Sequence, residues 1–178
     1  MIIGITGPIA AGKTTIAEMI KKKGFSYFSY SDILRIEARK RGIEPTRENL
    51  QKLGTKVKKD SNNPGILSRL IIENAKGDVV ADGIRTPDEI RELRKCESWV
   101  FGINASQRIR YERLVGRNRP GDPKDFESFK KIDDDENSGR NSGQAIGECM
   151  RNSDFVIDNN GTIAELEKKI DVLMARLR

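Results

Sequence analysis

The segment that most constrains this chain is residues 7–14, which read Gly-Pro-Ile-Ala-Ala-Gly-Lys-Thr and fit the pattern GxxxxGK[ST]. In this pattern the glycines let the backbone curl around a phosphate, the lysine reaches the outer phosphates and the hydroxyl binds magnesium. The apolar run 2–6 before it is typical of a buried strand, and residues 14–23 after it are typical of a helix. A strand, loop and helix in this order direct free N–H groups at an anion. The alternative is a simple glycine turn between strand and helix.

The motif predicts which residues contact a phosphate donor. Lys13 is the expected catalytic side chain, and the backbone of residues 9–15 is expected to hold the donor phosphates. The residues expected to bind the nucleotide are Gly7, Ile9, Ala10, Ala11, Gly12, Lys13, Thr14 and Thr15.

Apolar runs alternate with helix-like segments along the whole chain. The runs span residues 2–5, 25–29, 79–84, 99–103 and 155–157. This alternation predicts an α/β fold with a parallel sheet, and the 178 residues form one domain. Two connections, 31–77 and 117–140, are longer than the sheet requires, which is typical of lids and substrate covers.

Composition limits the kind of partner. With 33 lysines and arginines against 27 acidic residues, the net charge is +6. The few aromatic residues do not alternate with the basic ones, which argues against a nucleic-acid partner and favours a polyanionic small molecule. Histidine is absent, which excludes an imidazole base or ligand. We find no signal peptide and no membrane span, so we expect a cytoplasmic protein with no membrane partner.

Charged residues follow two predicted strands, at the edge where an open α/β sheet binds its ligand. Asp32 and Arg35 follow the second strand, and Asp82 and Arg85 lie at the end of the third. Two arginines there would grip the phosphate of an acceptor substrate. Asp82 would hold a magnesium-bound water together with the Thr14 hydroxyl. The alternatives are an N-cap role for Asp32, solvent-exposed arginines and a structural role for Asp82.

Three further segments are candidates for the site. Arg113, Arg117 and Arg119 would stabilise the transferring phosphoryl group if a lid closed, although a solvated role is equally compatible with each. The acidic run 133–136 reads as a solvated segment or a salt-bridge partner of the lid rather than a metal site. Asn159 and Gly161, before the last helix, would border the nucleotide base; the alternative is an ordinary Asn-Gly turn with a helix cap.

These residues together resemble the nucleoside monophosphate kinases of the P-loop superfamily over most of the chain. In adenylate-kinase-like members, Gly-Asp-Leu-Leu-Arg and Asp-Gly-Phe-Pro-Arg segments supply acceptor-binding arginines, and Arg35 and Arg85 match these positions. The resemblance implies a three-layer α/β/α fold with a five-stranded parallel sheet of order 2-3-1-4-5. It also implies an acceptor-binding insertion near 31–65, a lid near 117–140, and ATP or GTP as donor with Mg²⁺. The chain looks closest to adenylate-kinase-related archaeal proteins.

The sequence departs from this pattern at several points. Ile84 replaces the Phe-Pro pair, and Lys130 and Lys131 stand where adenylate kinases carry arginines. The segments 4–7 and 154–162 instead look like those of dephospho-CoA kinases, although the His-Pro motif of that family is absent. We therefore expect a kinase acting on a nucleoside or deoxynucleoside monophosphate. Transfer to a ribose hydroxyl, and an NTPase switch or assembly factor, remain alternatives. Either a monomer or a homodimer is compatible.

Overall fold

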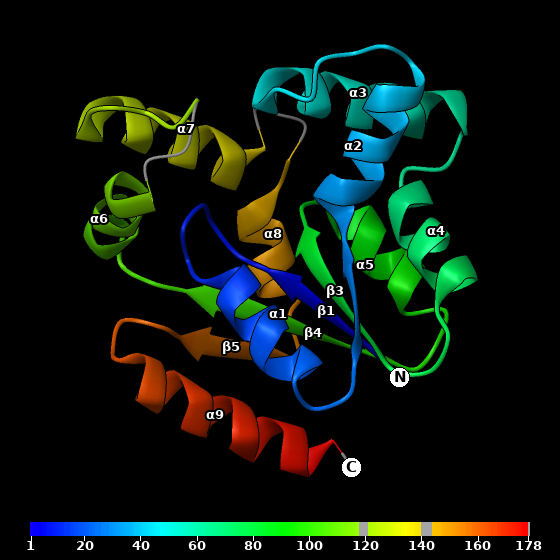
Figure 1. Ribbon diagram of the computed structural model, residues 1–178. Coiled ribbons are helices and arrows are strands. Elements are labelled where there is room, and N and C mark those ends of the chain that lie inside the picture. The colour runs from blue at the N-terminus through cyan, green and yellow to red at the C-terminus, as the bar shows by residue number, and fades with distance from the viewer. Residues whose placement is uncertain (118–120, 140–143, 178) are drawn as a thin grey trace.

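The computed structural model describes residues 1–117, 121–139 and 144–177. A parallel sheet lies at its centre, with strand order β2-β3-β1-β4-β5 (Figure 1). The strands are β1 (Ile2–Thr6), β2 (Ser26–Ser29), β3 (Val79–Ile84), β4 (Ser98–Asn104) and β5 (Phe155–Asp158). The predicted fold class and strand order 2-3-1-4-5 are confirmed. β1 pairs with β3 on one side and with β4 on the other, so it lies at the centre of the sheet. Its five residues are all buried, as the continuous apolar run indicated.

Helices cover both faces of this sheet (Figure 1). One face packs against α1 (Lys13–Lys21) and α9 (Ile163–Arg176). The opposite face packs against α4 (Ile66–Asn74), α5 (Pro87–Leu93) and α8 (Ile146–Arg151). Two buried apolar clusters, one on each face, make this a three-layer α/β/α domain.

Two of the helices begin with a capping box, in which residues close in the sequence pair with each other. Thr86 and Glu89 form a reciprocal capping box at the start of α5, and Thr162 and Glu165 form another at the start of α9. In each, the threonine hydroxyl and the glutamate carboxylate bind backbone N–H groups that the first helical turn leaves unpaired.

Four more helices lie beyond the carboxyl ends of the strands (Figure 1). They are α2 (Tyr30–Lys40), α3 (Arg47–Asp60), α6 (Gln107–Arg117) and α7 (Phe126–Ser138). The first two fall within the predicted insertion near 31–65, and α7 falls within the predicted lid near 117–140. Among the described residues, no helix is long and apolar enough to cross a bilayer.

Candidate functional site

The loop between β1 and α1 has the backbone conformation that a phosphate cradle needs. Gly7 and Gly12 have φ values of 146° and 101°, and Ala10 also lies in the left-handed region at 59°. A side chain at Gly7 would clash with the backbone of Ile103. The glycines of the motif are therefore required by the fold itself, and the loop curls as the sequence predicts.

Lys13 lies over this loop. Its Nζ donates hydrogen bonds to the carbonyl oxygens of Gly7 and Pro8 at 2.7 and 2.8 Å. Burial and the nearby charge of Arg85 lower the pKa of Lys13 from 10.5 to about 8, while Asp82 and Glu136 partly oppose this shift. The positive charges of Arg85 and Arg110 disfavour the protonated form of Lys13. A bound polyanion would offset these charges and stabilise the protonated lysine.

The turn after β5 holds the loop from behind. The Nδ2 of Asn159 donates to the carbonyl oxygen of Ala11 at 2.8 Å, and a Cβ added at Gly12 would overlap that amide group. Asn159 is buried and does not line the cleft described below, and Gly161 beside it is exposed. What the structure reveals for Asn159 is support of the loop; contact of these two residues with a base stays a prediction.

Thr14 and Asp82 come together as the sequence predicts. The Thr14 hydroxyl donates to Asp82 Oδ2 at 3.0 Å, and the Tyr27 hydroxyl donates to the same oxygen at 3.2 Å. Burial and the Asp82 charge raise the pKa of Tyr27 to about 12, so this phenol stays protonated and remains a donor. A hydroxyl and a carboxylate beside a phosphate loop fit Mg²⁺, which takes one or two protein oxygens together with phosphates and water.

A cleft of about 1020 Å³ opens above the loop, beyond the ends of β2 and β3. Single-ligand pockets span roughly 300–1,000 Å³, so this cleft is large enough for a donor and an acceptor together. The predicted site residues that line it are Ile9, Ala10, Gly12, Lys13, Thr14, Thr15, Asp32, Arg35, Asp82, Arg85, Arg113 and Arg117. The structure thus brings both strand-end arginines to one cavity with the loop.

The two strand-end arginines differ in their surroundings. Arg35 pairs with Asp32 at 2.7 Å on the exposed surface of α2, and the N–H of Asp32 is capped by Ser29. Arg85 donates through Nη1 to the side-chain oxygen of Gln144 at 2.5 Å and lies 3.9 Å from a Glu136 oxygen. Arg85 therefore points toward the lid side of the cleft, whereas Arg35 lies on its outer rim.

The arginines of α6 have three different environments. Arg113 donates to the Asn159 carbonyl oxygen at 2.9 Å, and its Nη1 is the only buried side-chain N or O atom without a partner in the described part of the chain. Arg117 makes a bidentate pair with Asp122, at 2.8 Å for each bond. Arg119 lies outside the described residues. Arg113 thus lines the cleft and has one buried donor group without a partner.

Two residues of helix α7 belong to the acidic run 133–136 of the sequence, which did not predict them as part of the site. Asp133 and Glu136 are buried, 5% and 3% exposed, and both are ion-paired, so the salt-bridge interpretation of this run is confirmed for them. Asp133 makes a bidentate pair with Arg110 of α6, and Glu136 pairs with Arg47 of α3. Their spacing of three residues puts both on one helix face, but only the fold supplies the distant arginines.

Comparisons with known proteins agree with this geometry. A family model for an AAA domain matches residues 6–125. A UPF0200 protein of Hyperthermus butylicus is 32% identical, over 99% of this chain and 95% of its own. The UPF0200 protein PH1008 of Pyrococcus horikoshii is 34% identical, over 99% of this chain and 97% of its own. The chain carries an AAA domain and belongs to the UPF0200 family.

Solved structures place this UPF0200 protein among P-loop kinase-like folds. A shikimate kinase from Bacteroides thetaiotaomicron superposes with a TM-score of 0.66 at 13% identity, covering 99% of this chain and 98% of its own. A shikimate kinase from Acinetobacter baumannii in complex with shikimate gives 0.65 at 19%, covering 98% and 93%. A gluconokinase from Sinorhizobium meliloti gives 0.54 at 15%, covering 98% and 91%. At these identities the likeness establishes the fold alone, and the predicted P-loop kinase fold is confirmed.

Proposed function

We propose that this protein is an ATP- and Mg²⁺-dependent kinase that transfers a phosphoryl group to a nucleoside or deoxynucleoside monophosphate. The observation that carries the proposal is the single cleft with a phosphate loop on one side and Arg85 on the other. A P-loop NTPase that serves only as a switch needs the loop, but it does not need a second cationic pocket facing it.

In this proposal the loop amides and Lys13 hold the donor phosphates. The unpartnered Nη1 of Arg113 is available to the charge that spreads over the transferring phosphoryl oxygens. Thr14 and Asp82 would hold Mg²⁺, which supplies Lewis-acid neutralisation of the phosphate charge. Arg85, with Arg35 at the rim, would orient the acceptor phosphate for in-line attack.

A monophosphate acceptor requires no general base, because its second pKa is near 6 and its oxygens are already largely ionised at neutral pH. The absence of histidine is compatible with this chemistry. Catalysis would then consist of positioning and electrostatic stabilisation, which the arrangement of cations in the cleft supports.

Transfer to a hydroxyl is the second candidate. Two of the structural neighbours are shikimate kinases, one of them bound to shikimate, and a hydroxyl acceptor benefits from a carboxylate base. Asp32 lines the cleft and is the side chain available for that role. The dephospho-CoA-like sequence ending also favours a hydroxyl acceptor.

The test is a panel of acceptors assayed for ADP or GDP release and for the phosphorylated product. It contains ribo- and deoxyribonucleoside monophosphates, dephospho-CoA and shikimate, each with ATP and with GTP. We expect diphosphate formation from at least one monophosphate, and Arg85→Ala should raise its KM by about 10–100-fold, the loss of a bidentate charged contact. Hydrolysis without any acceptor, stimulated by RNA or by a protein, would instead favour the switch.

A further inference from the structure

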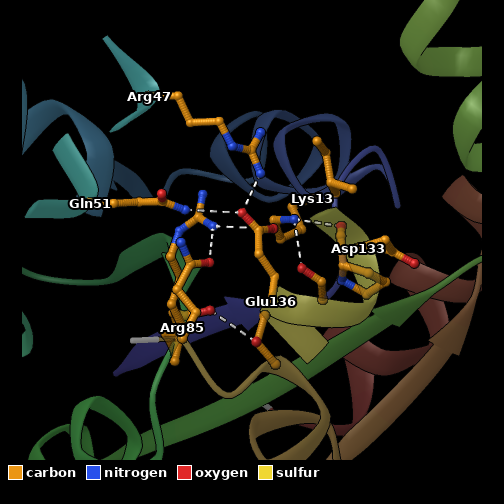
Figure 2. Close-up of polar contacts among 12 residues, drawn as sticks. Lys13, Arg47, Gln51, Arg85, Asp133 and Glu136 are labelled. Atoms are coloured by element: carbon orange, nitrogen blue, oxygen red, sulfur yellow. Dashed lines mark hydrogen bonds and ion pairs between the residues drawn. The ribbon is translucent and has the colours of Figure 1, made fainter. Parts of the chain in front are cut away.

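The most unusual group in the cleft is the carboxylate of Glu136. It belongs to α7, and Arg47, Gln51 and Arg85 converge on it (Figure 2). The Nη2 of Arg47 and the side-chain amide of Gln51, the latter at 3.3 Å, donate to Oε1, and Arg85 Nη1 lies 3.9 Å from Oε2. One carboxylate thus lies among donors from α3 and from the end of β3.

The donors around Glu136 have the composition of an anion-binding pocket. Two arginines and an amide present several N–H groups, and planar guanidinium groups match the oxygens of carboxylates and phosphates. Lys13 lies close enough for the charge of Glu136 to oppose part of the lowering of the Lys13 pKa. Both arginines line the cleft and are about one-third exposed, with side-chain exposures of 34% and 36%. A ligand entering the cleft therefore meets these groups directly.

Charge balance decides what can share this pocket. Arg47 and Arg85 carry two positive charges, and Glu136 neutralises one of them. A monophosphate carries about −1.5 to −2 at neutral pH, so it matches the two arginines only when the carboxylate has left. If the monophosphate and the Glu136 carboxylate were both present, about three negative charges would face the two positive charges of Arg47 and Arg85. The two anions would then repel each other.

Resting on the proposed function, we propose that Glu136 occupies the position of the acceptor's anionic group in the ligand-free protein and is displaced when the acceptor binds. The pocket of Arg47, Gln51 and Arg85 then recognises the phosphate or carboxylate of the acceptor. The residue sets specificity, because an acceptor without such a group cannot replace the ion pair that it breaks.

The opposite role is a positioning one, in which Glu136 stays in place and holds the arginines ready. The two roles differ in the sign of one measurement. If Glu136 is a competitor, removing its charge strengthens anion binding; if it positions the arginines, removing its charge weakens it.

The experiment compares Glu136→Gln with the wild type and with Glu127→Gln, an exposed glutamate on the same helix. Calorimetry measures the binding of three probes, AMP, inorganic phosphate and shikimate, at constant ionic strength. The phosphate probes and shikimate distinguish a phosphate from a carboxylate as the recognised group. We expect Glu136→Gln to bind at least one probe about tenfold more tightly, while Glu127→Gln binds like the wild type, and Arg47→Ala added to Glu136→Gln should abolish the gain.

Hydrogen exchange on the ligand-free proteins gives a second readout that does not depend on catalysis. Because Glu136 joins α7 to α3, we expect faster exchange in residues 47–60 and 126–138 of Glu136→Gln only. Glu136→Asp, which retains the charge on a shorter side chain, serves if the glutamine variant does not fold and should show a smaller gain in affinity.

Equal or weaker binding of every probe by Glu136→Gln, or no binding of any probe, overturns the proposal. Failure of the proposed function gives a different result. Tighter anion binding by Glu136→Gln without any turnover would support the displacement of Glu136 and contradict only the kinase assignment. Turnover of a monophosphate together with unchanged affinity in Glu136→Gln would support the kinase assignment and overturn the displacement of Glu136.

Discussion

The two sides of the cleft are built in different ways. On the donor side, a single segment of the backbone makes the site, and residues a few positions apart supply its glycines, lysine and hydroxyl. On the acceptor side, side chains from α3, α7 and the end of β3 meet through ion pairs that join residues as much as 89 positions apart. The donor loop therefore takes its shape from local glycine geometry, with Asp82 and Asn159 as its distant partners, whereas the acceptor side depends on the docking of a helix.

This difference predicts that the docking of α7 is the more easily disrupted of the two sides. Asp133→Ala should give the largest effect, because it leaves the buried Arg110 charge without its partner; both side chains are 7% exposed. Breaking such a buried pair costs about 3–5 kcal/mol. Urea unfolding followed by circular dichroism measures the loss, with the exposed neighbour Asp134→Ala as control. A loss below about 1 kcal/mol would contradict the view that this pair anchors α7.

Lys13→Met tests the donor side. It should reduce phosphoryl transfer by about 100–1,000-fold, the cost of removing one preorganised cationic group from such a site. The fold should remain, because Lys13 bonds only two carbonyl groups of its own loop. The variant is compared with wild type by acceptor-dependent turnover and by far-UV circular dichroism. An active and folded variant would remove Lys13 from the catalytic machinery.

Gly12→Ala measures how firmly the donor loop is held from behind. The substitution places a side chain at φ 101° and against the Asn159 amide, so we expect a loss of about 1–3 kcal/mol in the free energy of unfolding. In the Asn159→Ala background the clash is gone and only the backbone strain remains, so the cost should be smaller. Equal costs in both backgrounds would show that Asn159 does not restrict the loop.

The smallest predicted effect is on pH dependence. Because the pKa of Lys13 is lowered to about 8, the free protein loses this charge as the pH rises through 8. The affinity for Mg·ADP should therefore fall with rising pH, by about tenfold per unit above pH 8, if binding requires the protonated form. Calorimetry from pH 7 to 9.5 checks this, and Lys13→Met should give a flat profile. A flat wild-type profile would contradict the assignment.

The same contrast explains what the sequence could predict. The parallel sheet and the Thr14 to Asp82 contact depend on local patterns and on the regular geometry of parallel sheets, so they were accessible. The strand order came only from the resemblance to the P-loop kinases. The role of Glu136 was not accessible, because an acidic residue in a charged run has the composition of a solvated surface. The burial of Glu136 depends on where α7 docks. Contacts with residues distant in sequence, among them Arg47 and Arg110, hold α7 in that position.

Arg110 illustrates the same limit. Its spacing from Arg113 and Arg117 is helical and puts the three residues on one face, but a spacing cannot tell which arginine faces inward. In the structure Arg110 is buried and bonds to the carbonyl oxygens of Ile9 and Ala105 as well as to Asp133. It connects α7 to the phosphate loop, whereas Arg113 Nη1 has no partner among the described residues.

The bond between Asn159 and Ala11 has a consequence for synthesis. A ribosome makes the phosphate loop well before the amide that holds the loop in place, which follows nearly 150 positions later, directly after β5. Nascent domains acquire structure progressively as they emerge. The phosphate loop is therefore translated long before it gains the hydrogen bond from Asn159. A chain truncated before residue 159 should lack this bond to the loop.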